Sequence, residues 1–88
     1  MKHLPSPEDY FTANVQRLGR ANQTGWAIGL CPFHDDHNPS LSVNLESGAF
    51  ACHACGAKGS GVISFHMRLT GLSYRDAARE LEKGIYAY

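Results

Sequence analysis

Apolar residues in this chain recur with a helical spacing near both ends and with a strand spacing in the middle. Near the N-terminus, Phe11, Val15 and Leu18 recur at i, i+4 and i+7, which places them on one face of a helix. Ser6 followed by Pro7 is a typical helix start, because a serine caps the first turn and proline is tolerated at its first position. The pattern predicts a helix from Pro7 to about Leu18.

The middle of the chain alternates between apolar and small or polar residues, which is typical of β-strands. Three short strands are expected, at residues 26–30, 41–45 and 49–52. The segment Glu46-Ser47-Gly48 has turn composition and separates the second strand from the third. These segments predict a small antiparallel sheet.

Two helices are expected after the strands. The first runs from Val62 to about Thr70 and stops at Gly71, and the second is capped by Ser73 and ends near Gly84. In the second helix we expect an inward face and an outward face, made respectively of Tyr74, Ala77, Ala78 and Leu81 and of Arg75, Arg79, Glu80 and Lys83. Residues 56–61 are rich in glycine but lack a nucleotide-binding pattern, so they are expected to be a relaxed connection.

The length suits one small domain, expected to cover residues 1–88 with a core at about 8–84. A chain of 88 residues buries little apolar surface and usually needs a disulfide, a metal or a partner. With 43% hydrophobic and 18% charged residues, the composition is that of a folded protein. No apolar run reaches the roughly 20 residues of a membrane span, and no secretory signal is recognisable. We therefore expect a cytoplasmic location and no membrane association.

The charges are balanced overall but unevenly distributed. Eight Lys and Arg match eight Asp and Glu, which gives no general sign of a nucleic-acid partner. However, no acid occurs between Tyr10 and His34 or between Ser47 and Arg75. The sequence is therefore compatible with a locally positive face and also with a mixed solvated surface.

The cysteines point to a metal site. Three cysteines cannot all pair within one chain, and a reducing compartment disfavours disulfides. Cys52 and Cys55 have the spacing of a metal knuckle, and Cys31-Pro32-Phe33-His34 is a matching knuckle with histidine as its second ligand. We predict that Cys31, His34, Cys52 and Cys55 bind one structural zinc ion.

Other readings of these residues are weaker. A redox Cys-x2-Cys pair normally opens a helix in a βαβ unit, which is not the pattern around Cys52. A catalytic zinc keeps one position for water, whereas four protein ligands are supplied here. His37 and His53 are expected to face solvent or a partner, and His66 to have a structural or solvent role. No nucleophile with a base and no carboxylate pair suggests catalysis.

Four segments closely resemble one known family: Cys31 to Val43 (CPFHDDHNPSLSV), Cys52 to Gly59 (CHACGAKG), Val62 to Met67 (VISFHM) and Leu72 to Ala78 (LSYRDAA). They resemble the CHC2 zinc-finger domain of bacterial and phage DNA primases, over roughly residues 8–84. The elements predicted above already make a zinc ribbon, a small α+β fold whose short antiparallel sheet carries the Cys3His site and is flanked by an N-terminal helix and two C-terminal helices. The resemblance adds the expectation that the domain binds one zinc ion and helps to recognise a single-stranded DNA template where a primer is started in DNA replication.

The family's polymerase chemistry belongs to a separate, metal-dependent domain for which 88 residues leave no room. The resemblance therefore implies that this chain is not an enzyme by itself. The expected partners are the single-stranded template and a primase catalytic domain or another replication protein. The alternative is a zinc ribbon that docks on a replication or mobile-element protein without touching DNA.

Binding of single-stranded DNA would use aromatic side chains for base stacking and cations for phosphates. The candidate contacts are Trp26, Phe50, Lys58, Arg17, Arg20, His37 and Asn38. For Trp26 and Phe50, a place in the small core is an equally good interpretation. Arg68, Arg75 and Arg79 are expected to be solvated helix charges.

Overall fold

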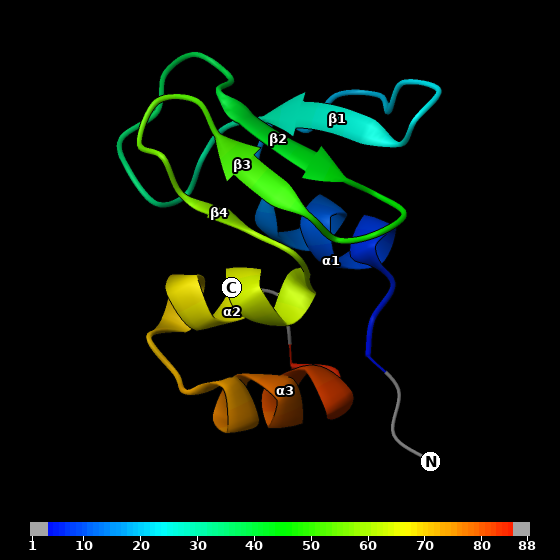
Figure 1. Cartoon of the computed structure of the whole chain (residues 1–88), viewed down its shortest axis with the longest axis vertical. Helices are drawn as coiled ribbons and strands as arrows, with labels where there is room; N and C mark the ends of the chain where they lie inside the picture. Colours follow the sequence, from blue (N-terminus) through cyan, green and yellow to red (C-terminus); the bar gives the residue numbers. More distant parts are fainter. Residues whose placement is uncertain (1–3, 86–88) are drawn as a thin grey trace.

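The computed structural model describes residues 4–85, so residues 1–3 and 86–88 of the predicted domain lie outside the described part (Figure 1). Within that part the elements are α1 (Pro7–Asn14), β1 (Trp26–Gly29), β2 (Leu41–Asn44), β3 (Phe50–Cys52), β4 (Lys58–Gly59), α2 (Val62–Thr70) and α3 (Tyr74–Glu82). The predicted α+β architecture, with one helix before the sheet and two after it, is confirmed.

The strands form an antiparallel sheet in the order β1-β2-β3-β4, and the helices lie below it in Figure 1. Val43 in β2 lies opposite Ala27 in β1 and Phe50 in β3. These three residues are buried, so this face of the sheet packs on the core. The small residues Ala27 and Gly29 make up the inward face of β1, which leaves Ile28 on the outward face.

The core is an aromatic cluster centred on Phe65 of α2. The ring centroids of Tyr10, Phe11, Phe33 and Phe50 lie 5.6, 5.1, 4.8 and 4.9 Å from that of Phe65. Edge-to-face and tilted packing at these distances is favourable beyond the burial of area alone. Phe65 thus joins α1, the sheet and the loop after β1 into one core.

His66 is buried beside this cluster and joins the three helices. Its Nδ1 lies 2.9 Å from the Tyr10 hydroxyl of α1, and its Nε2 lies 2.8 Å from Oε1 of Glu80 in α3. A buried imidazole needs such partners, because an unpaired buried polar group is costly. Of the two roles expected for His66, structural or solvent-exposed, it therefore has the structural one.

Helix α1 ends earlier than the apolar spacing predicted, at Asn14 instead of about Leu18. Val15 is already extended, and the next residues pair with β1: the Leu30 amide donates to the Gln16 carbonyl and the Gly19 amide to that of Ile28. Gly29 allows this close approach, since a Cβ there would lie 2.5 Å from Cγ1 of Val15. Long-range pairing with the sheet edge therefore determines where α1 ends, in place of the local helical spacing.

Strand β4 was not predicted, and the interpretation of residues 56–61 as only a relaxed connection is wrong for Lys58 and Gly59. These two residues pair with Ala51 and Phe50 of β3. A Cβ on Gly59 would lie 2.6 Å from the Phe50 ring, so only glycine lets this strand lie so close. A two-residue strand has too few positions to show alternation.

Helices α2 and α3 have the predicted ends. Gly71 ends α2 with a left-handed φ of 78°, and the Ser73 hydroxyl accepts a hydrogen bond from the Asp76 amide at the start of α3. Tyr74 was predicted to face inward, which is wrong: as the first residue of α3 it is 61% exposed, and the small Ala77 fills the buried position one turn later. The helices described between residues 4 and 85 are too short to cross a membrane.

Candidate metal centre

The two predicted knuckles meet at one end of the sheet. The first follows β1, and the second begins at Cys52, the last residue of β3. These two strands run in the same direction because each is antiparallel to β2. Both loops therefore leave the sheet at the same end, on the left in Figure 1. The His53 amide donates to the Ser40 carbonyl, which ties the second knuckle to the residue just before β2.

The side chains of Cys31, His34, Cys52 and Cys55 converge there. Their ligand atoms all lie within 4.8 Å of one another. Cys31 Sγ lies 3.8 Å from Cys55 Sγ, and Cys52 Sγ lies 3.4 Å from His34 Nε2. A tetrahedral zinc site with Zn–S distances of about 2.3 Å has sulfur atoms about 3.8 Å apart. Three thiols and one imidazole at this separation fit a structural zinc ion.

Backbone hydrogen bonds shape each knuckle around its sulfur. The Phe33 amide donates to Cys31 Sγ at 3.4 Å, and the Cys55 amide donates to Cys52 Sγ at 3.5 Å. Gly56 then turns the chain with a φ of 78°, a conformation that favours glycine. These amides stabilise negative charge on the sulfurs, which is the form that binds metal.

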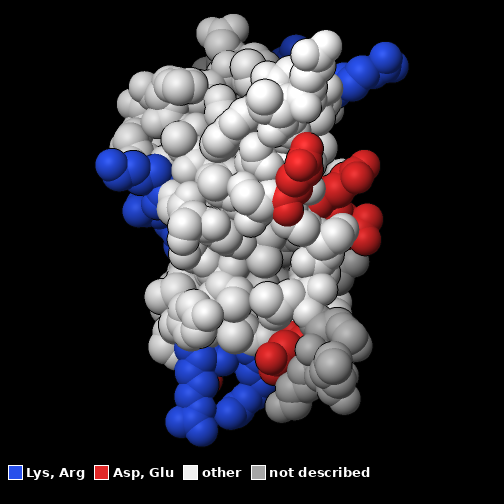
Figure 2. Space-filling view, turned by 45° about the vertical axis from the view of Figure 1, so that its right-hand side comes forward, with Lys and Arg blue, Asp and Glu red and all other residues white. Residues whose placement is uncertain are grey.

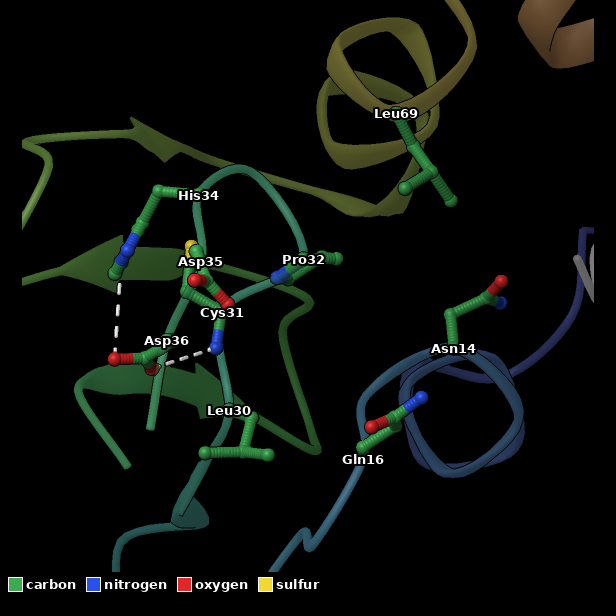
Figure 3. A pocket seen from close by; sticks show the side chains of 9 residues that line it. All are labelled: Asn14, Gln16, Leu30, Cys31, Pro32, His34, Asp35, Asp36 and Leu69. Carbon is green, nitrogen blue, oxygen red and sulfur yellow. Dashed lines mark hydrogen bonds and ion pairs between the residues drawn. The ribbon is translucent and has the colours of Figure 1, made fainter. Parts of the chain in front are cut away.

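Asp36 is not a ligand but holds the first knuckle in place by hydrogen bonds, and sequence reasoning missed this role. Its Oδ2 accepts hydrogen bonds from the Cys31 amide and the Ser40 hydroxyl, both at 2.9 Å. Its Oδ1 lies 3.9 Å from His34 Nε2, and Figure 3 shows the carboxylate between His34 and the Cys31 backbone. The hydrogen bond from the Cys31 amide, with smaller contributions from Ser40 and His34, lowers the pKa of this carboxyl.

The ligand side chains differ in their tendency to ionise before metal binding. Burial is the main reason why the pKa of the Cys31 thiol rises to about 12. Burial also acts to raise the pKa of Cys52, but hydrogen bonds from Ser40, from the Cys55 and Ala54 amides and from His34 outweigh it and lower the value to about 6. The interaction with Cys52 is the main cause of a raised pKa at His34. Of these two thiols, Cys52 is the one better prepared to bind a metal as a thiolate.

The other histidines singled out in the sequence lie outside this cluster of described residues. His37 is exposed, and its Nε2 lies 3.3 Å from Oδ2 of Asp35. His53 is exposed as well, and its Nε2 lies 3.2 Å from the hydroxyl of Ser42 on β2. The imidazole of His53 therefore leans over the outward face of the sheet.

The predicted nucleic-acid contacts are scattered over several parts of the structure. Phe50 is only 2% exposed and packs in the core, so its proposed role in base stacking is wrong. The remaining candidates are at least partly accessible: Trp26 on β1, Lys58 on β4, Arg17 and Arg20 between α1 and β1, and His37 and Asn38 in the first knuckle loop. Of these, the sheet brings Trp26 and Lys58 onto its outward face.

We expect Asp36→Ala to lower the affinity for zinc about 10- to 100-fold, the usual cost of removing a residue that orients metal ligands. The substitution leaves the Cys31 amide without its carboxylate acceptor. The neighbouring Asp35→Ala is the matched control, because that carboxylate is 90% exposed. Competition with a chromophoric chelator measures both, and equal affinities would exclude the supporting role of Asp36.

Known proteins similar to this chain are consistent with a zinc site at these residues. The family model described as the CHC2 zinc finger matches residues 12–87. The chain is 38% identical over 66 residues to the DNA primase of Rickettsia conorii and 42% identical over 71 residues to that of Mycoplasma genitalium, covering 75% and 78% of this chain but 11% and 12% of those proteins. The chain thus spans about a tenth of the length of these curated relatives.

A solved structure is similar as well. The crystal structure of the Aquifex aeolicus primase, with its zinc-binding and RNA polymerase domains, matches with a TM-score of 0.74 and 30% identity. The match covers 92% of this chain and 19% of that one. The family match and the Cys3His cluster together show that the protein binds one structural zinc ion. The chain belongs to the CHC2 zinc finger family.

Proposed function

We propose that this chain is the nucleic-acid-binding module of a primase and binds the single-stranded DNA template for a catalytic domain that lies outside it. The observation that supports this most is the outward face of the sheet, which lies on the opposite side from the core. Much longer relatives, of which this chain matches only 11% and 12%, carry the name DNA primase. We therefore propose that residues 1–88 form one non-catalytic domain, working in the cytoplasm with a primase catalytic domain or another replication protein.

In this proposal Cys31, His34, Cys52 and Cys55 hold zinc for a structural purpose. When bound, the ion supplies a rigid tetrahedral anchor and no reaction step. Cys31 and His34 lie in the loop after β1, Cys52 ends β3 and Cys55 lies in the loop after it, so the ligands fix both loops to the same end of the sheet. Fixing these loops keeps the outward face in one shape before any strand binds, which lowers the ordering cost of binding.

The outward face presents one residue from each strand in a row. Ile28 lies opposite Ser42, Ser42 opposite Ala51, and Ala51 opposite Lys58. Ile28 is 52% exposed, Ser42 and Ala51 are half-buried, and Lys58 is exposed. Trp26 shares this face two residues before Ile28, and His53 leans over Ser42. An antiparallel sheet with aromatic rings on its free face is a known platform for single-stranded nucleic acids.

The charge on this face favours a polyanion. The row contains a lysine and no acid, although the chain as a whole has a net charge of zero. Sequence reasoning selected Trp26 and Lys58, expected His53 to face solvent or a partner without naming it as a contact, and missed Ser42. The alternation within each strand could have assigned Ser42 to the outward face, whereas the position of His53 depends on the knuckle.

We expect Trp26→Ala to weaken binding of single-stranded DNA by about 1–3 kcal/mol, the usual loss on removing one stacked base. Tyr74→Ala is the matched control, because Tyr74 is an exposed aromatic residue on α3, away from the sheet. Fluorescence anisotropy of a labelled oligonucleotide at low salt measures the affinity. Trp26 is the only tryptophan of the chain, so quenching of its emission reports stacking directly.

Exposed Ile28 and the zero net charge favour a second candidate, a protein-docking zinc ribbon. The same titration separates the two functions. Salt-sensitive binding with quenching of Trp26 supports the DNA-binding module. No binding of the zinc-loaded protein at low salt contradicts it and favours protein docking, which a pull-down with a primase catalytic domain would then test.

A further inference from the structure

We propose that Lys58, Ser64 and Arg68 form a phosphate-binding ledge at the β4 edge of the sheet, which holds the backbone of a single strand where it leaves the outward face. This proposal rests on the proposed function and adds Arg68 and Ser64, which sequence reasoning did not select. The ligand group is a phosphodiester. The proposal depends on the shape of the surface, on the support of Arg68 and on the local charge.

The ledge surrounds one shallow concavity on the surface. Its lining consists of Lys58, Gly59, Ser64, Met67, Arg68 and Leu72. Ser64 and Arg68 lie four residues apart in α2, so they share one face of that helix. Two cationic side chains and a hydroxyl therefore border the same hollow, which is the donor set that binds phosphate oxygens in protein complexes with nucleic acids.

Gly59 makes this arrangement possible. A Cβ at Gly59 would lie 2.6 Å from the Phe50 ring and 2.9 Å from Cβ of Ser64, so β4 can pack this closely on α2 only with glycine. The close packing brings Lys58, the preceding residue, next to the side chains of α2. The glycine that sequence reasoning assigned to a relaxed connection thus has a defined part in the surface.

Arg68 is held in position by an aromatic ring. Its guanidinium carbon lies 5.8 Å from the centroid of the Phe33 ring, within the range of a cation–π contact. Phe33 in turn packs on Phe65 of the core, with ring centroids 4.8 Å apart. Phe33 lies between Cys31 and His34 in the first knuckle, so the support of Arg68 is attached to the metal centre. A guanidinium stacked in this way loses less entropy when it binds phosphate.

The lining of the ledge carries two cations and no acid. No acid occurs anywhere from Ser47 to Arg75, and among the ion pairs of the described residues none involves Lys58 or Arg68. Figure 2 shows basic side chains at the left-hand side of the molecule at mid-height, whereas the acids at that height lie on the right. Both cations of the ledge are therefore available to an external anion.

The ledge continues the proposed binding face. Lys58 is the last residue of the row that begins at Ile28, and it also lines the concavity with Arg68. Neighbouring strands lie about 4.8 Å apart, so a nucleic-acid strand crossing from β1 to β4 covers about 14 Å and then reaches the ledge. Bases would contact the sheet, and the backbone would contact Lys58 and Arg68 at its edge.

The test is the salt dependence of single-stranded DNA binding for Arg68→Gln and Lys58→Gln, with Arg79→Gln as the control. Arg79 is an exposed arginine on α3 and does not line the concavity. Each lost phosphate contact should reduce the slope of log K against log salt by about 0.7. The advantage of the unaltered protein over either ledge variant should thus shrink about threefold when salt rises fourfold. Arg68→Lys should keep most of the slope.

A second probe identifies the bound group. An oligonucleotide with uncharged methylphosphonate linkages should bind Arg68→Gln and the unaltered protein equally well. If the unaltered protein binds DNA but Arg68→Gln keeps its full slope, the ledge is wrong and the proposed function stands. If the unaltered protein binds no DNA at low salt, the proposed function is wrong and the ledge with it. Equal slope losses for Arg79→Gln and Arg68→Gln would mean general charge attraction, which also contradicts the ledge.

Discussion

Removal of zinc is expected to abolish the cooperative unfolding transition of this protein. Capture of zinc contributes an apparent 10–16 kcal/mol in zinc-finger peptides, which is about as large as the whole stability of a typical domain. Without the ion, the two knuckle loops after β1 and β3 have no common anchor. Thermal unfolding followed by circular dichroism, before and after chelation and after return of zinc, measures the effect.

Two histidine variants make a matched pair for the same prediction. His34→Ala should behave like the chelated protein, because the His34 imidazole supplies one of the four clustered ligand atoms. His53→Ala should unfold like the unaltered protein, since that imidazole is exposed and bonds only to Ser42 among the hydrogen bonds described for it. A metal-free protein that still melts cooperatively near the original temperature would contradict the prediction, as would a collapse caused by His53→Ala.

The metal centre could be predicted from the sequence because each knuckle is local. Two ligands separated by two residues point at one place in a tight turn, whatever the rest of the chain does. Only the position of the two knuckles next to each other depends on the fold. The alternation in the strands was enough to predict the antiparallel sheet that brings them together. Asp36 was missed because its role depends on Cys31 and Ser40 on either side of it, at distances that only the folded loop defines.

Two errors in the fold, the end of α1 and the missed strand β4, have a common cause, which is contact with distant segments. The spacing of Phe11, Val15 and Leu18 is helical, yet the chain leaves the helix at Val15 to pair with the edge of β1. Lys58 and Gly59 carry no strand pattern, yet they pair with β3 because glycine fits against the Phe50 ring. The periodicity of apolar residues shows which face of an element is apolar. It does not show which distant segment will form hydrogen bonds with the backbone.

The same limit applies to the proposed binding surface. Arg68 looks like a solvated helix charge in the sequence, because its neighbours Phe33 and Lys58 come from other elements. Phe50 looks like a stacking residue, because aromatic residues in a strand suit either face. Its side of the sheet follows from the register, which sets Phe50 opposite the buried Val43.

Phe65→Ala is expected to destabilise the zinc-loaded protein by about 3–5 kcal/mol, the usual range for removing a buried aromatic side chain. The ring is fully buried and packs against four other rings from α1, the first knuckle and β3. Tyr74→Ala is the control, because Tyr74 is an aromatic residue of similar size that is largely exposed. Thermal unfolding in excess zinc compares the two variants with the unaltered protein.

The apparent zinc affinity of Phe65→Ala should fall together with its stability. If the chain is unfolded without metal, zinc binding and folding are one equilibrium, and a loss of about 3–5 kcal/mol lowers the apparent affinity by roughly two to three and a half orders of magnitude. Phe33 provides the physical link, because it lies between two ligands and packs on Phe65. A variant that loses stability but keeps its full zinc affinity would show instead that the knuckles fold without the core, and the metal centre and the aromatic cluster would then be separate units.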